Sequence, residues 1–254
     1  MITLVSPAKN LDFDTPPVTE EFSIPKHLDQ SKKLIKALKK LSKEELSDLM
    51  KISPQLSDLN HHRYSIWDSK FDLTNAKQAI LAFNGEVYNG LQAEKLSKED
   101  FDFAENHFRI LSGLHGLLKP LDLIQPYRLE MGTKFGGGMA KNLYEIWRPI
   151  VTADLNEELA GKERSIILNL ASNEYFKAVD QKKLNADVIT PTFKDNRGGN
   201  FKVIMMYAKK MRGAMARFAI QNRISDPEEL KAFNQEGYSF NESMTENNNW
   251  VFTR

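Results

Sequence analysis

The chain begins with the run ITLV (residues 2–5), which Ser6 and Pro7 end abruptly. This run predicts a short buried β-strand, because apolar and β-branched residues stand together and proline then removes a backbone donor and turns the chain. Lys9 follows just beyond the carboxyl end of the strand. Similar apolar runs predict four further strands, at residues 78–83, 109–112, 165–170 and 201–207.

The segments between the predicted strands carry helical signals. Residues 25–41 are amphipathic, residues 42–45 form a capping box that begins another helix, and residues 97–107 form a third capped helix. A further helix follows the strand predicted at residues 201–207. Because strands alternate with helices, we predict an α/β fold with a mixed, largely parallel sheet flanked by helices.

The composition indicates a globular protein. The chain has 254 residues, of which 41% are hydrophobic, so it can bury a substantial core. No apolar run approaches the roughly 18 residues that cross a bilayer, and the start lacks the features of a signal peptide. No repeat or linker divides the chain, so we predict one domain, residues 1–254, in the cytoplasm and without membrane contact. The absence of cysteine excludes disulfides, thiolate metal sites and iron–sulfur clusters.

Residues 197–223 carry seven basic side chains and no acidic one. The whole chain has a formal net charge of +1, so this segment at +7 leaves the remainder near −6. Segregated charge of this kind predicts an anion site, and a polyanion is the first partner to expect; a merely solvated surface is the alternative. The basic residues are Arg197, Lys202, Lys209, Lys210, Arg212, Arg217 and Arg223.

The predicted strands end in small or polar residues. In an open α/β sheet, ligands bind in the crevice at the carboxyl ends of the strands. If the basic helix begins where the fifth strand ends, its lysines reach the same edge as Lys9. The turn from Gly113 to Gly116 would offer backbone amides to a phosphate oxygen. The other candidate residues of this polar cleft are Ser6, Ser112, Asn169, Ser172 and Glu174.

Two groups of residues raise the question of catalysis or ligand binding. Arg128 could clamp a phosphate that Glu130 orients, or the two could form a structural ion pair. Ser172, Glu174 and Tyr175 could supply catalytic groups, but no histidine accompanies them, and helix capping explains Ser172. No H-E-x-x-H, Walker A or G-x-G-x-x-G pattern occurs. The sequence therefore assigns no catalytic residue, metal ligand or cofactor, and it favours a protein without enzymatic activity.

Short segments spread along the chain carry a family resemblance. They are Ser6-Pro7-Ala8-Lys9, residues 79–83, Gly85 with residues 88–91, residues 111–114, 117–122, 125–132, 169–172, 174–176, Tyr207-Ala208-Lys209-Lys210, Phe233-Asn234 and residues 236–238. Taken together and in register, they resemble the bacterial YaaA-type peroxide-stress family over nearly the whole chain.

The resemblance implies a cytoplasmic protein of the hydrogen-peroxide response, with an α/β fold of unusual topology, a positively charged cleft and a helix-hairpin-helix element. The turn at residues 113–116 is weakly reminiscent of that element. Members of the family bind duplex and branched DNA without evident sequence preference and are linked to lower available iron. Charge and placement then favour the following DNA contacts: Lys9, Arg128, Lys209, Lys210, Arg212, Arg217 and Arg223.

The leading prediction is a DNA-binding protein without sequence specificity that protects DNA under peroxide and helps limit free iron. Its partners would be double-stranded or branched DNA and DNA-repair proteins. The alternative is an enzyme acting on a phosphorylated or nucleotide-like small molecule through Lys9, Ser172 and Glu174. A third hypothesis, an iron-sequestering protein, needs Asp, Glu and His ligands because cysteine is absent.

Overall fold

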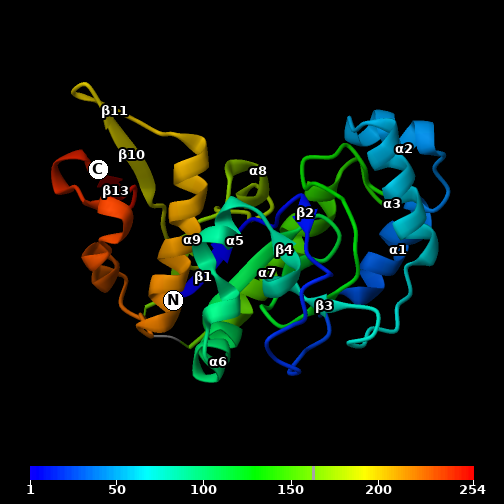
Figure 1. Ribbon diagram of the computed structural model, residues 1–254, viewed down its shortest axis with the longest axis horizontal. Coiled ribbons are helices and arrows are strands. Elements are labelled where there is room, and N and C mark those ends of the chain that lie inside the picture. The colour runs from blue at the N-terminus through cyan, green and yellow to red at the C-terminus, as the bar shows by residue number, and fades with distance from the viewer. Residues whose placement is uncertain (162–163) are drawn as a thin grey trace.

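A five-stranded sheet lies at the centre of the computed structural model, which describes residues 1–161 and 164–254 (Figure 1). The strand order is β6–β5–β1–β8–β9, with β1 parallel to β5 and β8, β8 parallel to β9, and β6 antiparallel to β5. The strands are β1 (Ile2–Val5), β5 (Phe108–Ser112), β6 (Gly116–Leu118), β8 (Ile166–Asn169) and β9 (Asp187–Ile189). The predicted α/β fold with a mixed, largely parallel sheet is confirmed.

The first strand occupies the middle of this sheet. All of its residues are buried, and Thr3 pairs with Phe108 on one side and with Leu168 on the other. A strand covered on both faces reads as a continuous apolar run, which is why residues 2–5 are recognisable in the sequence. The strands predicted at residues 109–112 and 165–170 are confirmed for the same reason.

Two predicted strands are wrong. Residues 78–83 form the end of β3 (Lys77–Gln78), a turn of helix α4 (Ala79–Ala82) and the start of β4 (Phe83–Asn84), because a short apolar run suits a buried helix as well as a strand. Residues 201–207 belong to β11 (Asn200–Lys202) and to helix α9 (Met205–Gln221). The basic helix therefore does not follow a strand of the central sheet.

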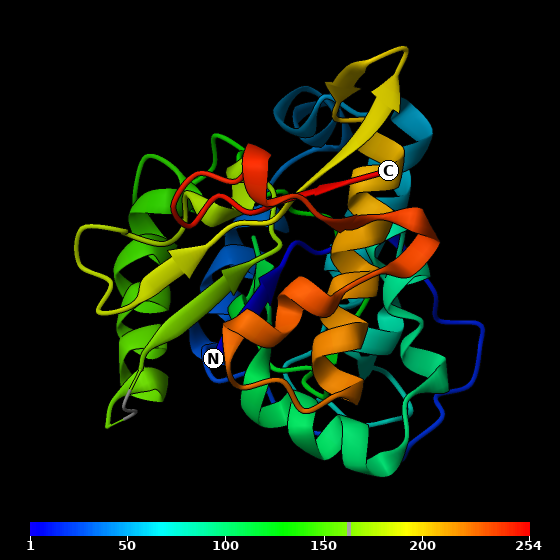
Figure 2. The same cartoon turned by 90° about the vertical axis from the view of Figure 1, so that its left-hand side faces the viewer.

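Strand β11 instead folds back on β10 (Thr192–Arg197) in a second sheet. Gly198 and Gly199 have φ values of 61° and 89°, which glycine adopts without strain and which allow the tight reversal. The second sheet has the order β11–β10–β13–β12, with β12 (Ser239–Phe240) and β13 (Val251–Thr253). Both views show the β10–β11 hairpin projecting from the body of the molecule (Figure 1 and Figure 2).

Helix α9 packs closely against α5 (Glu86–Leu91), and two glycines permit this contact. A Cβ atom on Gly90 would lie 1.9 Å from the carbonyl oxygen of Lys210, and one on Gly213 would lie 1.7 Å from that of Val87. The two backbones therefore touch, which fixes the position of α9 and of its basic side chains relative to the central sheet.

The remaining helices surround the central sheet and extend to one side of it. Helices α1, α2 and α3 gather at the end of the molecule opposite the β10–β11 hairpin (Figure 1). Helix α6 confirms the helix predicted at residues 97–107, the capping box at Ser42 is present, and α1 is shorter than predicted. These helices are α1 (Leu28–Leu38), α2 (Lys43–Met50), α3 (Pro54–Ile66), α6 (Lys98–His107), α7 (Leu143–Leu159) and α8 (Asn173–Phe176).

Short elements complete the chain. Two small antiparallel ladders join β2 to β4 and β3 to β7. The elements are β2 (Asn10–Leu11), β7 (Leu123–Ile124) and the 3-10 helices η1 (Ala93–Lys95), η2 (Pro227–Ala232), η3 (Gln235–Gly237) and η4 (Glu242–Met244). Within the described ranges, no helix combines the length and apolar character needed to span a membrane.

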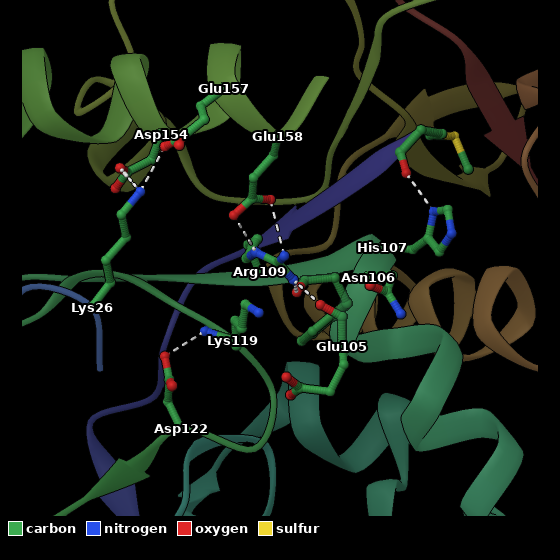
Figure 3. Close-up of polar contacts among 12 residues, drawn as sticks. Lys26, Glu105, Asn106, His107, Arg109, Lys119, Asp122, Asp154, Glu157 and Glu158 are labelled. Atoms are coloured by element: carbon green, nitrogen blue, oxygen red, sulfur yellow. Dashed lines mark hydrogen bonds and ion pairs between the residues drawn. The ribbon is translucent and has the colours of Figure 1, made fainter. Parts of the chain in front are cut away.

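Charged side chains at the amino edge of the central sheet are tightly paired (Figure 3). Arg109, near the start of β5, is 4% exposed and donates from Nε to Glu158 Oε1 of α7 over 3.0 Å. Its NH1 group also donates to the carbonyl oxygens of Glu105 and Phe108. Lys26 makes ion pairs of 2.8 Å with Asp154 and Glu157 of the same helix. The Arg109 contact holds α7 against the sheet, and the Lys26 ion pairs hold the same helix against the segment before α1.

Candidate anion-binding cleft

A cleft of about 690 Å³ opens at the carboxyl ends of β1 and β8, bordered by α5 and the first turns of α9. Segments distant in sequence meet there, as expected for the edge of a parallel sheet. Seven of the fourteen predicted site residues line it. They are Ser6, Lys9, Arg128, Ser172, Glu174, Lys209 and Arg212.

The four cations of the cleft differ in depth. The side chain of Lys9 is 64% exposed and Lys209 is also exposed, so both stand at the rim. Arg128 is 15% exposed and Arg212 is half-buried, so both guanidinium groups lie deeper. Burial lowers the pKa of the Arg212 guanidinium from its ordinary value, but an arginine remains charged. The cleft thus holds positive charge at two levels.

Glu130 forms ion pairs with two of these cations. Its Oε2 lies 3.2 Å from Lys9 Nζ, and its Oε1 accepts a hydrogen bond of 2.8 Å from Arg128 NH2. The structural ion pair considered for Arg128 and Glu130 is therefore present. Arg128 nevertheless keeps a buried Nε–H group without a hydrogen-bond partner. An unsatisfied buried donor is costly, and because this atom is itself buried, a ligand reaches it only if neighbouring side chains move.

Lys209 and Arg212 have no such carboxylate. Among the described residues, neither side chain takes part in an ion pair or hydrogen bond, and neither is near enough to Glu130 or Glu174 to form a salt bridge. They project from one face of α9, three residues apart. Two unpaired cations beside a concave surface can bind an anion without first giving up an internal partner.

The polar side chains at and near the predicted catalytic candidates are used in hydrogen bonds within the fold. Ser6 Oγ accepts a hydrogen bond of 2.9 Å from the Ser172 amide and donates one of 3.2 Å to Ser172 Oγ. Glu174 Oε1 accepts a hydrogen bond of 2.9 Å from the Gly132 amide. Ser172 precedes α8, but its hydroxyl makes no capping hydrogen bond, so helix capping does not explain it. These contacts fasten the segment after β8 to the end of β1.

Aromatic residues also line the cleft, and the sequence marks only one of them, Tyr175, as a candidate for the site. Phe83 lies 5.5 Å from Tyr88 and 6.4 Å from Tyr127 between ring centroids, and Tyr175 lines the same cleft. Burial raises the pKa of the Tyr88 and Tyr175 hydroxyls well above the ordinary value, so both stay neutral. These rings come from separate segments of the chain, and only the fold unites them.

The turn at residues 113–116 lies inside the protein instead. Ser112 Oγ accepts hydrogen bonds of 3.2 and 2.9 Å from the Leu114 and His115 amides, so these donors are already used. Gly113 and Gly116 are buried, and a Cβ on Gly116 would meet the ring of Trp147. The turn joins β5 to β6 and not two helices. It therefore offers no exposed phosphate site, and the helix-hairpin-helix parallel fails at this position.

Ser112 and Asn169 are also absent from the cleft surface. Ser112 is fully buried and shares a hydrogen bond of 2.7 Å with the Tyr127 hydroxyl. Asn169 is 5% exposed, and its Oδ1 accepts a hydrogen bond of 3.1 Å from the Ala171 amide. Both side chains support the loops that follow their strands, which is a common task for polar residues at strand ends.

Three cations of the basic segment point elsewhere. Lys210 makes an ion pair of 2.6 Å with Glu236, Arg217 donates to Gln92 and Gln235, and Arg223 pairs with Asp100 at 2.5 Å. None of the three lines the cleft. The long run without acidic residues is therefore divided by the helix into cleft cations and cations that bind neighbouring segments.

A pair of short helices provides a second exposed turn. Residues 51–53 join α2 to α3, with Lys51 in the left-handed region at φ 52° and Ser53 accepting a hydrogen bond from the Leu56 amide. The Tyr64 hydroxyl of α3 donates to the carbonyl oxygen of Arg128, which links this pair to the cleft. The capping box at the start of α2 is recognisable in the sequence, whereas α3 was not predicted.

Metal ligands do not gather in the part of the chain that the structure describes. In residues 1–161 and 164–254, no group of three histidine, aspartate or glutamate side chains is arranged to hold a metal ion. Of the three carboxylates that line the cleft, Glu130 is engaged with Lys9 and Arg128, Glu174 accepts from a backbone amide, and Glu86 accepts a hydrogen bond of 3.5 Å from Asn89.

The fold and the cleft define an α/β protein with a polar crevice at the carboxyl edge of its central sheet, lined by four cationic side chains and three carboxylates. Residues 1–244 match the family described as peroxide stress protein YaaA. The chain is also 53% identical over 254 residues to a "UPF0246 protein" of Colwellia psychrerythraea strain 34H, covering 100% of this chain and 99% of that protein. The chain therefore belongs to the YaaA peroxide-stress family, as the resemblance in its sequence indicated.

Proposed function

We propose that this peroxide-stress protein binds DNA in the cytoplasm without sequence specificity and so shields it during oxidative stress. The observation that supports the proposal is the cleft, where Lys209 and Arg212 stand without carboxylate partners beside Lys9 and Arg128. Cations of this kind can replace the counterions of the phosphate backbone, which is the main source of non-specific affinity for DNA.

The turn between α2 and α3 is a second point of contact in this proposal. It joins two helices through three residues and presents Lys51. In this respect it fits the helix-hairpin-helix element that the family resemblance implies. At the amino end of α3, Pro54 has no amide proton and Ser53 accepts from the Leu56 amide, so the contribution of this turn to binding is the charge of Lys51. Because such contacts reach the backbone and not base edges, they carry no sequence information.

Binding should be insensitive to sequence and sensitive to salt. The measurement is fluorescence anisotropy of the purified protein with labelled duplexes of unrelated sequence and with a four-way junction, across a salt series. The dissociation constants of the duplexes should agree within about threefold, and about five neutralised phosphates predict a log–log salt slope of roughly −4 to −5. Absence of binding at low salt, or a strong preference for one sequence, would contradict the proposal.

A role in limiting free iron accompanies DNA binding in the family resemblance. The described residues assemble no cluster of metal ligands, so we propose that any such role proceeds without direct sequestration. Incubation with Fe(II) followed by desalting tests this point, because a protein that sequesters iron retains it on the column. Retention of about one equivalent or more would overturn this part of the proposal.

The size of the cleft favours one alternative, an enzyme or sensor that takes a nucleotide-like small molecule. A volume of about 690 Å³ lies within the range of small-ligand pockets, and Lys9, Ser172 and Glu174 all line it. Thermal-shift measurements with adenosine monophosphate would reveal such a ligand as a concentration-dependent rise in Tm. Loss of that rise in Lys9→Ala, in a protein that fails to bind duplex DNA, would favour the alternative.

A further inference from the structure

We propose that the cleft accepts a single nucleotide extruded from the DNA helix, with Met205 as the side chain that takes its place in the base stack. The inference rests on the proposed DNA binding and adds what the cleft would hold. Four observations support it: the volume of the cleft, the depth of its arginines, its aromatic lining, and the exposed methionine at its border.

The volume sets the first constraint. A duplex is about 20 Å across and cannot enter a space of about 690 Å³, so a bound helix must lie over the opening. The same space suits a ligand the size of one nucleotide, and proteins that extrude a nucleotide receive it in a fitted pocket. If the duplex contacted only the rim, the space inside the cleft would hold no part of the DNA.

The placement of the cations supplies the second argument. Exposed Lys9 and Lys209 stand where the backbone of an overlying duplex would pass. Arg128 and Arg212 lie deeper, and the buried Nε of Arg128 has no hydrogen-bond partner. A phosphate or base that enters the cleft can approach these guanidinium groups more closely than the backbone of a duplex lying over the opening can.

The apolar side chains inside the cleft and at its border suit the base of a nucleotide. Phe83 and Tyr175 line the cleft and are 4% and 8% exposed, so they provide an apolar wall against which a base can pack. Met205 lines the cleft and is 59% exposed at the first residue of α9. Apolar side chains that intrude between base steps commonly stabilise distorted DNA. Met206 is similarly exposed, at 53%, but does not line the cleft.

The test uses the full-length protein and a duplex that contains one 2-aminopurine, whose fluorescence rises when it leaves the stack. A terminal dye reports binding by anisotropy in the same sample. The wild-type complex should raise 2-aminopurine emission several-fold. A duplex with the probe opposite a mismatched base should bind about tenfold more tightly than the matched duplex, since an unpaired base costs less to extrude.

Three variants distinguish extrusion of a nucleotide from binding of the duplex over the cleft opening. Met205→Ala should reduce the emission change by at least about half, and Met206→Ala, its matched control, should leave it unaltered. Asn84 is exposed and lines the cleft, so Asn84→Trp should fill the interior. That variant should abolish the emission change and weaken the binding measured by anisotropy without eliminating it, because Arg128 and Arg212 lose their ligand while the rim lysines keep theirs. Circular dichroism verifies that each variant is folded.

The outcomes distinguish the two proposals. Rising anisotropy with flat 2-aminopurine emission in the wild type overturns nucleotide extrusion and leaves DNA binding intact. Equal effects of Met205→Ala and Met206→Ala overturn the role of Met205. If neither duplex binds, the proposed function itself fails. Thermal stabilisation by 2-aminopurine deoxyribonucleoside monophosphate, with no binding of duplex, would assign the cleft to a free nucleotide and overturn extrusion from DNA.

Discussion

The two edges of the central sheet use the same residue types in opposite ways. At the amino edge, Arg109 is 4% exposed and contacts Glu158 and two backbone carbonyl oxygens. At the carboxyl edge, Lys209 and Arg212 face the cleft without a partner, and Arg128 retains an unpaired Nε. A buried cation needs partners to be tolerated, so the first edge contributes to stability, whereas the second keeps its charge available for a ligand.

The largest expected effect is on folding stability at the amino edge. Arg109→Leu would leave the partly buried Glu158 carboxylate without its partner, and we expect a loss of about 3 kcal/mol in the free energy of unfolding. Lys9→Leu, at the cleft rim, should change stability by less than about 0.5 kcal/mol, because its ion pair with Glu130 is exposed. Urea unfolding measures both. Equal losses would remove the distinction between the edges.

A somewhat smaller effect is expected on the pH dependence of folding stability, through a histidine buried beneath the carboxyl edge. Burial lowers the pKa of His115 to about 3 in the folded protein, and its Nδ1 lies 2.9 Å from Ser31 Oγ. The unfolded chain binds a proton near pH 6.5 while the folded chain does not, so stability falls as the pH drops from about 6.5 toward 3.

Substitution of His115 by phenylalanine should remove this dependence. Between about pH 6.5 and pH 5 the wild type should lose about 2 kcal/mol more than His115→Phe, at roughly 1.4 kcal/mol per pH unit. Urea titrations at a series of pH values give the difference directly. Identical pH profiles would show that the turn at residues 113–116 is accessible to protons and is not part of the core.

The smallest effect belongs to the cations of α9 that point away from the cleft. Lys210 and Glu236 form an ion pair in which the side chains are 38% and 41% exposed. Lys210→Ala should therefore lower the free energy of unfolding by no more than about 0.5 kcal/mol and alter DNA affinity by less than about threefold. Thermal unfolding and anisotropy measure the two quantities. A tenfold loss of affinity would extend the binding surface beyond the cleft.

The sequence predicted those parts of the fold in which local pattern and tertiary structure agree. Residues 2–5, 109–112 and 165–170 are strands because a strand buried on both faces is apolar throughout. The apolar pattern of residues 78–83 does not distinguish a strand from a buried helix. Their helical turn depends on backbone amides that donate hydrogen bonds to the distant carbonyl oxygens of Pro120 and Asp122. The hairpin of β10 and β11 likewise depends on two glycines that looked like an ordinary loop.

The sequence predicted the positive charge of the candidate site. It did not show which cations face the cleft and which contact other segments. The run of cations identified α9, but its sequence does not show that Lys210 meets Glu236 and Arg217 meets Gln92, because these partners lie on other segments. Phe83 gave no signal and Tyr175 was considered only as a catalytic candidate, since aromatic residues are ordinary core components. Ser112 and the 113–116 turn looked polar and accessible, yet hydrogen bonds within the fold consume their donors.

The direct test of the cleft compares two double variants that change the net charge equally. Lys209→Glu with Arg212→Glu reverses cleft cations, and Lys210→Glu with Arg217→Glu reverses cations of the same helix outside it. In anisotropy titrations with one labelled duplex, the first pair should weaken binding about 100-fold at low salt and flatten the log–log salt slope by about 2. The second should weaken binding by less than about fivefold. Equal losses from both pairs, or a larger loss from the second, would contradict binding of DNA by the cleft.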